Sequence, residues 1–436
     1  MNFKKILESS PAFILPAVIN LFTLLVFTRN LSLEEYGMLS LALITIEFSQ
    51  GLIFQWIKLA MVRFYDFQKK IESITVALQL NIGICLLLIL FYAILFNSYF
   101  NYVDKAYVLF IILGVIGRSF CNFFLDFIRM TNVNFRKYTY VSLTSNIFYF
   151  VPALVYVSFN KSPQINTILG IQTVGVTIYM ICVLLSKYHI LVSVFKNFKK
   201  KAEYMEFINY GMPLIFVFLA ASAFVRIDRF IIEQNLGLAQ LGVYSAAYSL
   251  SNLAISSFFS IITLPTYPEI IRKLNNGKEV EAHKIYRNNG NLILGIGVPI
   301  VIACFYFNEV LTDLFFGDKG NKMALIFPYV IVGTFLLNLK THYFDQIFQF
   351  VKKTKFLMYL GLTIGICHFF LSYYLSIVFG SKGVAFSVSI LNFCAILFIY
   401  KYSRKIFKIT FSRTIIRFIF ITIISCLGTL LFNYFN

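Results

Sequence analysis

Long uninterrupted apolar runs are the feature of this 436-residue sequence that most restricts its fold. A helix needs about 20 apolar residues to cross the hydrocarbon of a bilayer, and many runs here reach that length. Apolar residues make up 59% of the chain and charged residues only 13%, well below the share of charge in water-soluble domains. The runs are continuous rather than alternating, which excludes a transmembrane β-barrel. The sequence therefore predicts an all-α polytopic membrane protein.

Twelve of these runs precede residue 401, and another apolar run follows. We predict membrane-spanning helices at 11–31, 37–62, 74–99, 106–129, 139–159, 165–186, 209–233, 241–265, 289–307, 323–350, 356–379 and 383–400, and an additional C-terminal helix at 415–433. Lys4 and Lys5 before an apolar stretch resemble a signal peptide. No small-residue cleavage site follows them, so the first helix is expected to be retained.

Lysine and arginine are distributed unevenly between alternate loops. With the N-terminus in the cytoplasm, 27 of the 38 basic residues fall in cytoplasmic segments and only 6 in outer loops. Cytoplasmic loops of membrane proteins carry such an excess, so we predict a cytoplasmic N-terminus. The same bias explains the net charge of +19 by attraction to anionic lipids of the inner leaflet, without binding of nucleic acid.

A sequence repeat divides the chain into two halves. Six positions recur at a constant spacing: Asn30, Leu31, Leu33, Gly37, Ser40 and Ala42 match Asn235, Leu236, Leu238, Gly242, Ser245 and Ala247. Each copy covers the end of one span and the start of the next. Because each repeat then holds an even number of spans, both halves have the same orientation in the membrane.

The repeat predicts two pseudo-symmetric six-helix lobes around a central cavity. The N-lobe is expected at 1–186 and the C-lobe at 209–400, joined by a basic cytoplasmic linker at 187–208. The segment 401–436 lies outside the repeat and holds basic residues and the additional span.

Five basic side chains lie inside predicted spans, where each costs about 2.5–3.5 kcal/mol on insertion scales. They are Lys58, Arg118, Arg226, Arg229 and Lys340. The same spans hold five other ionisable groups that could neutralise them or couple transport to an ion: Glu47, Asp126, Asp228, His342 and Asp345. At about 100° per residue, Glu47 and Lys58 share one helix face, and Arg118 and Asp126 belong to one polar stripe.

Two interpretations of these charges are open. In the first they are structural. Lys58, Arg226 and Arg229 lie near span ends, so their charged ends could reach the membrane surface, and Arg229 could pair with Glu233. Static ion pairs between helices could neutralise the others. In the second the five basic residues line a cavity with excess positive charge. Since Arg118 and Lys340 lie nearest the membrane midplane by these boundaries, that cavity would suit an anionic substrate, and arginine matches phosphate oxygens best.

Several functional classes lack their sequence signals. We find no phosphate-binding loop, no H-E-x-x-H metal motif and no G-x-S-x-G nucleophile, and the predicted outer loops are too short for a catalytic domain. The seven cysteines lie singly within apolar runs, as small buried residues do. We therefore expect no metal, no cofactor and no catalytic residue.

With these residues, the chain resembles a known family. The chain has two predicted six-helix lobes, each with the motif N-L-x-L-x-x-x-G-x-x-S-x-A, and its Ile227, Asp228 and Arg229 are followed by Gly237, Gly242 and Tyr244. These features resemble the Wzx-type flippases. These form part of the polysaccharide-exporter branch of the multidrug/oligosaccharidyl-lipid/polysaccharide (MOP) exporters. A thirteenth span departs from the even number usual there.

The resemblance implies a transporter rather than an enzyme. It implies a multi-pass protein of the bacterial inner membrane that moves undecaprenyl-pyrophosphate-linked O-antigen or capsule repeat units to the outer leaflet by rocking of the lobes. Membrane lipids and polysaccharide polymerase machinery are the implied partners. The alternatives are a cation-coupled multidrug exporter and a lipid II flippase of the same superfamily, and, from another class, a membrane polysaccharide polymerase.

Overall fold

The computed structural model describes residues 11–64, 70–98, 105–131, 135–186, 201–351 and 353–403, together with 412 and 417. Over these ranges the chain is helical and contains no strand, as the sequence predicts. The predicted C-terminal helix at 415–433 lies outside the described residues, apart from residue 417. The described chain divides into two compact units, one within Val18–Phe230 and one within Ile231–Asn436 that also includes the start of the first helix. We call them the 18–230 unit and the 231–436 unit.

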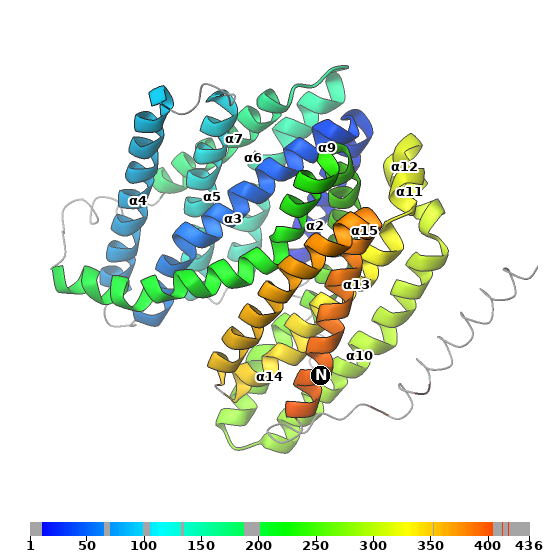
Figure 1. Cartoon of the computed structure of the whole chain (residues 1–436). Helices are drawn as coiled ribbons and strands as arrows, with labels where there is room; N and C mark the ends of the chain where they lie inside the picture. Colours follow the sequence, from blue (N-terminus) through cyan, green and yellow to red (C-terminus); the bar gives the residue numbers. More distant parts are fainter. Residues whose placement is uncertain are drawn as a thin grey trace, which may run out of the picture. The chain divides into compact units, whose positions relative to one another are not determined.

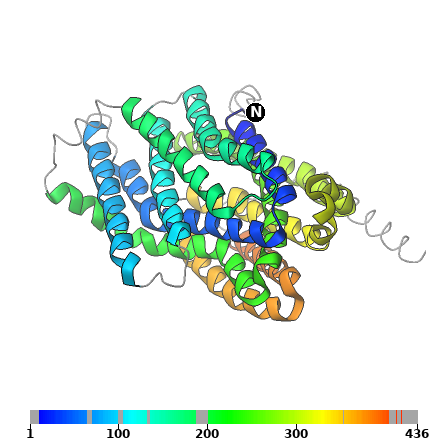
Figure 2. The same cartoon turned by 90° about the horizontal axis from the view of Figure 1, so that it is seen from above.

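Six apolar helices and part of a seventh build the 18–230 unit (Figure 1). They are α2 (Pro11–Asn30), α3 (Leu33–Phe64), α4 (Lys70–Ser98), α5 (Lys105–Thr131), α6 (Phe135–Phe159), α7 (Ile165–Ser186) and the first part of α9 (Lys201–Asn275). Helix α5 packs against α3, α4, α6 and α7 and lies beside α6 and α7 in both views (Figures 1 and 2). Side chains on α5 are therefore in reach of four other helices.

The 231–436 unit contains the rest of α9 and the helices after it. They are α10 (Glu279–Tyr306), α11 (Asn308–Phe316), the 3₁₀ turn η1 (Gly317–Lys319), α12 (Gly320–Ala324), α13 (Phe327–Leu339), the π-helical turn η2 (Lys340–Phe344), α14 (Asp345–Phe350) and α15 (Thr354–Ser403). Helices α13, η2 and α14 form one interrupted rod that packs against α10 and α15. This rod corresponds to the predicted span at 323–350.

Two of these helices are too long for a single membrane crossing. At 1.5 Å per residue, the 75 residues of α9 would extend about 110 Å, whereas the hydrocarbon layer is about 30 Å thick. The two long helices are α9 and α15. Each contains one residue with non-helical dihedral angles: Gly237 in α9 (φ 82°) and Gly380 in α15 (φ 61°). Positive φ is accessible to glycine at little cost, so these residues divide α9 and α15. The break at Gly237 lies between the spans predicted at 209–233 and 241–265. The break at Gly380 lies between the spans predicted at 356–379 and 383–400.

The break in α9 has a counterpart at the same place in the first copy of the repeat. There the chain leaves α2 after Asn30 and enters α3 at Leu33, with Ser32 between them at the position that Gly237 occupies in the second copy. Ser32 and Glu35 form a capping box: the Ser32 N–H donates to Glu35 Oε2 (2.7 Å) and the Glu35 N–H donates to Ser32 Oγ (3.2 Å). The repeated sequence thus encodes a repeated helix boundary.

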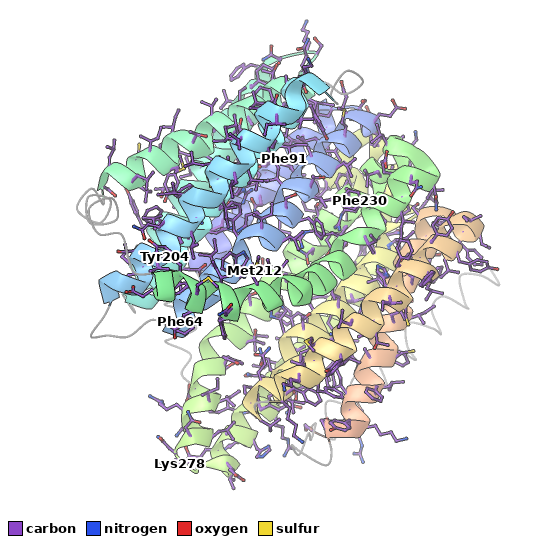
Figure 3. All side chains as sticks on the ribbon, turned by 60° about the vertical axis from the view of Figure 1, so that its left-hand side comes forward. Phe64, Phe91, Tyr204, Met212, Phe230 and Lys278 are labelled. Carbon is purple, nitrogen blue, oxygen red and sulfur yellow. The ribbon has the colours of Figure 1, made fainter. Side chains whose placement is uncertain are left out.

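Length and composition identify eight helices among the described residues that could cross a membrane, or up to nine if the bent pair Asn308–Ala324 and Phe327–Phe350 is one span. Large apolar side chains on these helices face outward. On α4, Leu86, Leu87, Leu90 and Phe91 are each more than half exposed, and Figure 3 labels Phe91. Such a patch would be unstable in water, and it is the expected surface of a helix in contact with lipid.

The start of α9 is fixed against α3 and α4 by aromatic packing. Phe64 at the end of α3 lies 5.1 Å from the Phe207 ring and 5.5 Å from the Tyr210 ring. The Tyr204 hydroxyl donates to the side-chain carbonyl of Gln79 on α4, and Phe64 and Tyr204 are labelled in Figure 3. These contacts anchor the helix that carries Arg226 and Arg229 further along.

We expect Gly175→Ala to loosen the contact between α6 and α7. A Cβ at Gly175 would lie 2.0 Å from the backbone oxygen of Phe148, so the two helices would have to separate, at a cost of about 1–3 kcal/mol. The matched control is Gly83→Ala on α4, where no atom lies within 4 Å of the added Cβ. Both substitutions gain the same helix propensity, up to about 1 kcal/mol. The measurement is the apparent melting temperature in detergent. Equal shifts for the two variants would contradict the close α6–α7 packing.

Candidate functional site

Lys58 on α3 pairs with Asp126 on α5. The Lys58 Nζ lies 2.7 Å from Asp126 Oδ2, and the carboxylate is nearly buried. Beside them is a cavity of about 10 Å³, room for a single water, lined by polar side chains that include Gln50, Asn81 and Asn122. The polar stripe predicted on α5 therefore meets the polar face of α3. Here the structure favours the structural interpretation, because the cation and the acid neutralise each other.

Glu47 on α3 pairs with Arg226 on α9, since Arg226 Nη2 lies 3.4 Å from Glu47 Oε2. The Glu47 side chain remains 52% exposed. Arg229, one turn further along α9, contacts its neighbour Asp228 through both its backbone N–H (2.8 Å) and its Nη1 (3.2 Å). Asp228 and Arg229 are both buried, so neither is a snorkelling side chain.

Lys340 and Asp345 form a buried ion pair within one helix in the 231–436 unit. Lys340 Nζ donates to Asp345 Oδ2 at 2.8 Å. In an α-helix, residues five apart point about 140° away from each other. The π-turn η2 removes that separation, because the Asp345 N–H bonds to the Lys340 carbonyl in an i→i+5 pattern that brings both side chains to one face. Asp345 Oδ1 is buried without a hydrogen-bond partner among the described residues.

His342 lies in the same π-turn, next to the ion pair. Its ring packs against Phe259 of α9, with the ring centroids 6.0 Å apart. No group of three His, Cys, Asp or Glu side chains that could hold a metal ion occurs in the described ranges.

Arg118 differs from the other four cations. Among the residues that the structure describes, no carboxylate lies within ion-pair distance of it, and its Nε is buried without a hydrogen-bond partner. Instead, its guanidinium lies over the Tyr149 ring of α6, with Cζ 3.9 Å from the ring centroid. Glu47 attracts Arg118 electrostatically from a greater distance. A desolvated cation–π contact contributes about 2 kcal/mol, less than a charge in hydrocarbon costs.

The ten predicted site residues therefore fall into separate groups. Four of the five cations are paired, and these pairs use all four acids: Glu47, Asp126, Asp228 and Asp345. Around Glu47 two cations, Arg118 and Arg226, share one acid within the 18–230 unit, which leaves one excess positive charge there.

Tyr149 is the site residue that the sequence analysis missed. It is buried, and its face is covered by a guanidinium. A weak signal was present, because Tyr149 occupies the middle of a predicted span, where tyrosine rarely lies without a polar partner. Among 27 tyrosines that signal does not select one residue.

The fold of the chain is found in solved structures of membrane transporters. It is similar to a lipid II flippase, MurJ, in an inward closed conformation (TM-score 0.73, 13% identity, 96% of this chain and 91% of that one). It is also similar to an inward-facing multidrug resistance MATE family transporter of the MOP superfamily (TM-score 0.65, 11% identity, 91% of this chain and 98% of that one). The chain thus has the all-helical fold of these two membrane transporters.

The sequence comparisons give the family. The model of a family described as polysaccharide biosynthesis protein matches residues 26–325, and the chain belongs to this family. The capsular polysaccharide biosynthesis protein CapF of Staphylococcus aureus is 24% identical over 225 residues, which are 51% of this chain and 55% of that relative. The match thus spans about half the length of each. The resemblance stated from the sequence motifs is confirmed.

We expect Lys340→Met to destabilise the protein by about 3 kcal/mol or more, because it leaves the Asp345 carboxylate buried without its cation. The double variant Lys340→Met, Asp345→Leu should regain much of that loss. The free energy of unfolding in SDS titrations measures both, with the exposed Lys401→Met as control. If single and double variants are equally unstable, Lys340 and Asp345 are not coupled.

Proposed function

We propose that the protein moves an undecaprenyl-pyrophosphate-linked oligosaccharide, an O-antigen or capsule repeat unit, from the inner to the outer leaflet of the bacterial cytoplasmic membrane by alternating access. Membership of a polysaccharide biosynthesis family and a flippase-like fold support this proposal. The capsular relative supports a saccharide as cargo. The excess of lysine and arginine in alternate loops supports a cytoplasmic N-terminus, and the family supports polysaccharide polymerase machinery as a partner.

Arg118, which has no acidic partner among the described residues, carries the proposal. A pyrophosphate cannot enter hydrocarbon without cationic partners, and a guanidinium binds two phosphate oxygens at once. A cation already neutralised by a carboxylate would have to lose that partner first. Arg118 has no such partner among the described residues, and its buried Nε–H has no acceptor there. We assign Arg118 as the principal phosphate-binding residue, with Arg226 beside it through the shared Glu47.

The cation-coupled exporter needs a carboxylate that is free to bind a cation. Glu47, Asp126, Asp228 and Asp345 each have a lysine or arginine within 3.4 Å. This pairing favours an anionic substrate over a cationic one. Lys58, Arg229 and Lys340 accordingly become positioning and structural cations in our proposal, and His342 a neighbour of the Lys340 pair.

The test is a transport assay in liposomes that contain the purified protein. A fluorescent undecaprenyl-pyrophosphate oligosaccharide is supplied, and a membrane-impermeant reductant bleaches the probe in the outer leaflet over time. Protein-dependent bleaching of the inner pool supports the proposal. Transport of lipid II alone would identify a lipid II flippase. Uptake of organic cations driven by a sodium or proton gradient, without lipid movement, would replace the proposal with the multidrug exporter.

We expect Arg118→Met to reduce the flipping rate at least tenfold while leaving the apparent melting temperature unchanged or raised. Removing a cation that lacks an acidic partner relieves a desolvation cost, and a loss of function with a gain of stability is typical of binding sites. Arg118→Lys should retain part of the rate, because lysine keeps the charge without the bidentate geometry. The control is Lys278→Met, which removes an exposed cation outside the site. Normal flipping by Arg118→Met would show that the substrate takes another path.

A further inference from the structure

The segment between α10 and α13 changes direction abruptly. Helix α10 ends at Tyr306, and α11 begins two residues later. The helical segment Asn308–Ala324 makes an angle of 98° with the helical segment Phe327–Phe350. If Phe327–Phe350 crosses the membrane along its normal, the mean axis of Asn308–Ala324, more than half of which is α11, therefore lies nearly parallel to the membrane plane. Its two ends join the ends of two spans, which places it at the membrane–water boundary.

This segment is a closed helical hairpin within the 231–436 unit. Figure 1 shows α11 and α12 together at the end of α10. The Asn308 side chain donates to the Ala324 carbonyl (3.2 Å) and so joins the two ends of the hairpin. Thr312 and Phe316 of α11 and Met323 of α12 are buried. The hairpin is thus an ordered element rather than an open loop.

One face of α11 is apolar and uncovered. Phe307, Val310 and Leu314 follow one another at spacings of three and four residues and lie within about 60° of each other around the helix. Each is at least 60% exposed. Glu309 and Asp313 are centred about 110° from this stripe, and α11 carries no basic residue. Helix α11 is therefore amphipathic, with its charge confined to one side.

The apolar stripe continues onto the outward surface of α10. Phe305 and Tyr306, the last residues of that helix, are also exposed, and Leu325 after α12 is 61% exposed. Since α10 is a candidate membrane span, its outward surface faces lipid. The stripe on α11 extends that surface around the bend.

We propose that α11 is an in-plane helix that lies on the lipid surface. Phe307, Val310 and Leu314 enter the boundary between head groups and acyl chains, while Glu309 and Asp313 face water. Amphipathic helices bind at this depth, about 5–10 Å into the interface. The polar face of α11 is acidic, and the hairpin as a whole carries three acids, with Asp318, against Lys319 and Lys322, so the partner is a zwitterionic lipid surface rather than an anionic one. The helix then fixes the depth at which α10 ends and α13 begins, independently of the cargo.

The test uses tryptophan as a depth probe in the full-length protein in phosphatidylcholine vesicles. The chain has one tryptophan, Trp56, which is buried, so the wild-type emission can be subtracted. Leu314→Trp reports the apolar face, and Glu309→Trp is the matched control on the acidic face of the same helix. Each is measured with acrylamide in the water and with lipids brominated at shallow or deep acyl positions.

We expect shallow bromines to quench Leu314→Trp at least twofold more than deep ones, and acrylamide to quench mainly Glu309→Trp. Greatest quenching of Leu314→Trp by deep bromines would show a re-entrant segment. Strong acrylamide quenching of both variants would show a hairpin that projects into water. Protection of Leu314→Trp from both quenchers would show that protein, such as a second copy of the chain, covers the face. Each of these three outcomes would overturn the proposal.

Discussion

An unneutralised charge is unstable in hydrocarbon, and this constraint explains most of the polar architecture of the protein. Each charged side chain costs about 2.5–3.5 kcal/mol at the centre of a span, so a partner must lie close to it. The chain supplies partners at three ranges of sequence separation. Asp228 and Arg229 are neighbours, Lys340 and Asp345 share one helix, and Lys58–Asp126 and Glu47–Arg226 join different helices. The interhelical pairs therefore also fix how α3 packs against α5 and α9.

Much of the fold was predictable because the membrane leaves few alternatives. In hydrocarbon every backbone N–H and C=O must bond within its own segment, so an apolar run of sufficient length becomes a helix. The repeat identified the helix boundary at Asn30 and at Asn235, and the structure places a capping box in one copy and Gly237 in the other. The sequence did not show that the second boundary would be a sharp break at a single residue, Gly237. The lobe limits at 186 and 209 stay predictions.

The candidate site was predictable only as a set of residue types. Periodicity placed Lys58 and Asp126 on the polar faces of their helices, and these faces do meet. Periodicity could not predict the Lys340–Asp345 pair, because side chains five residues apart point in different directions in an α-helix. The π-turn that brings these two together has no known sequence signature. Periodicity could not find Tyr149 either, since the contact depends on how α5 and α6 pack. Partner choice is thus a property of the tertiary structure, while the presence of charge is a property of the sequence.

The kind of partner decides what a buried cation can do. A carboxylate neutralises the charge fully but occupies the N–H donors that a phosphate would need. An aromatic ring neutralises the charge only in part, and the buried Nε–H of Arg118 has no acceptor among the described residues. Arg118 over Tyr149 has the second arrangement, with Glu47 exerting a weaker attraction from a distance. In our proposal this incomplete compensation is functional, because the site gains most of its stabilisation only when the anionic cargo is bound. It also permits release, since no competing ion pair has to re-form before the cargo leaves.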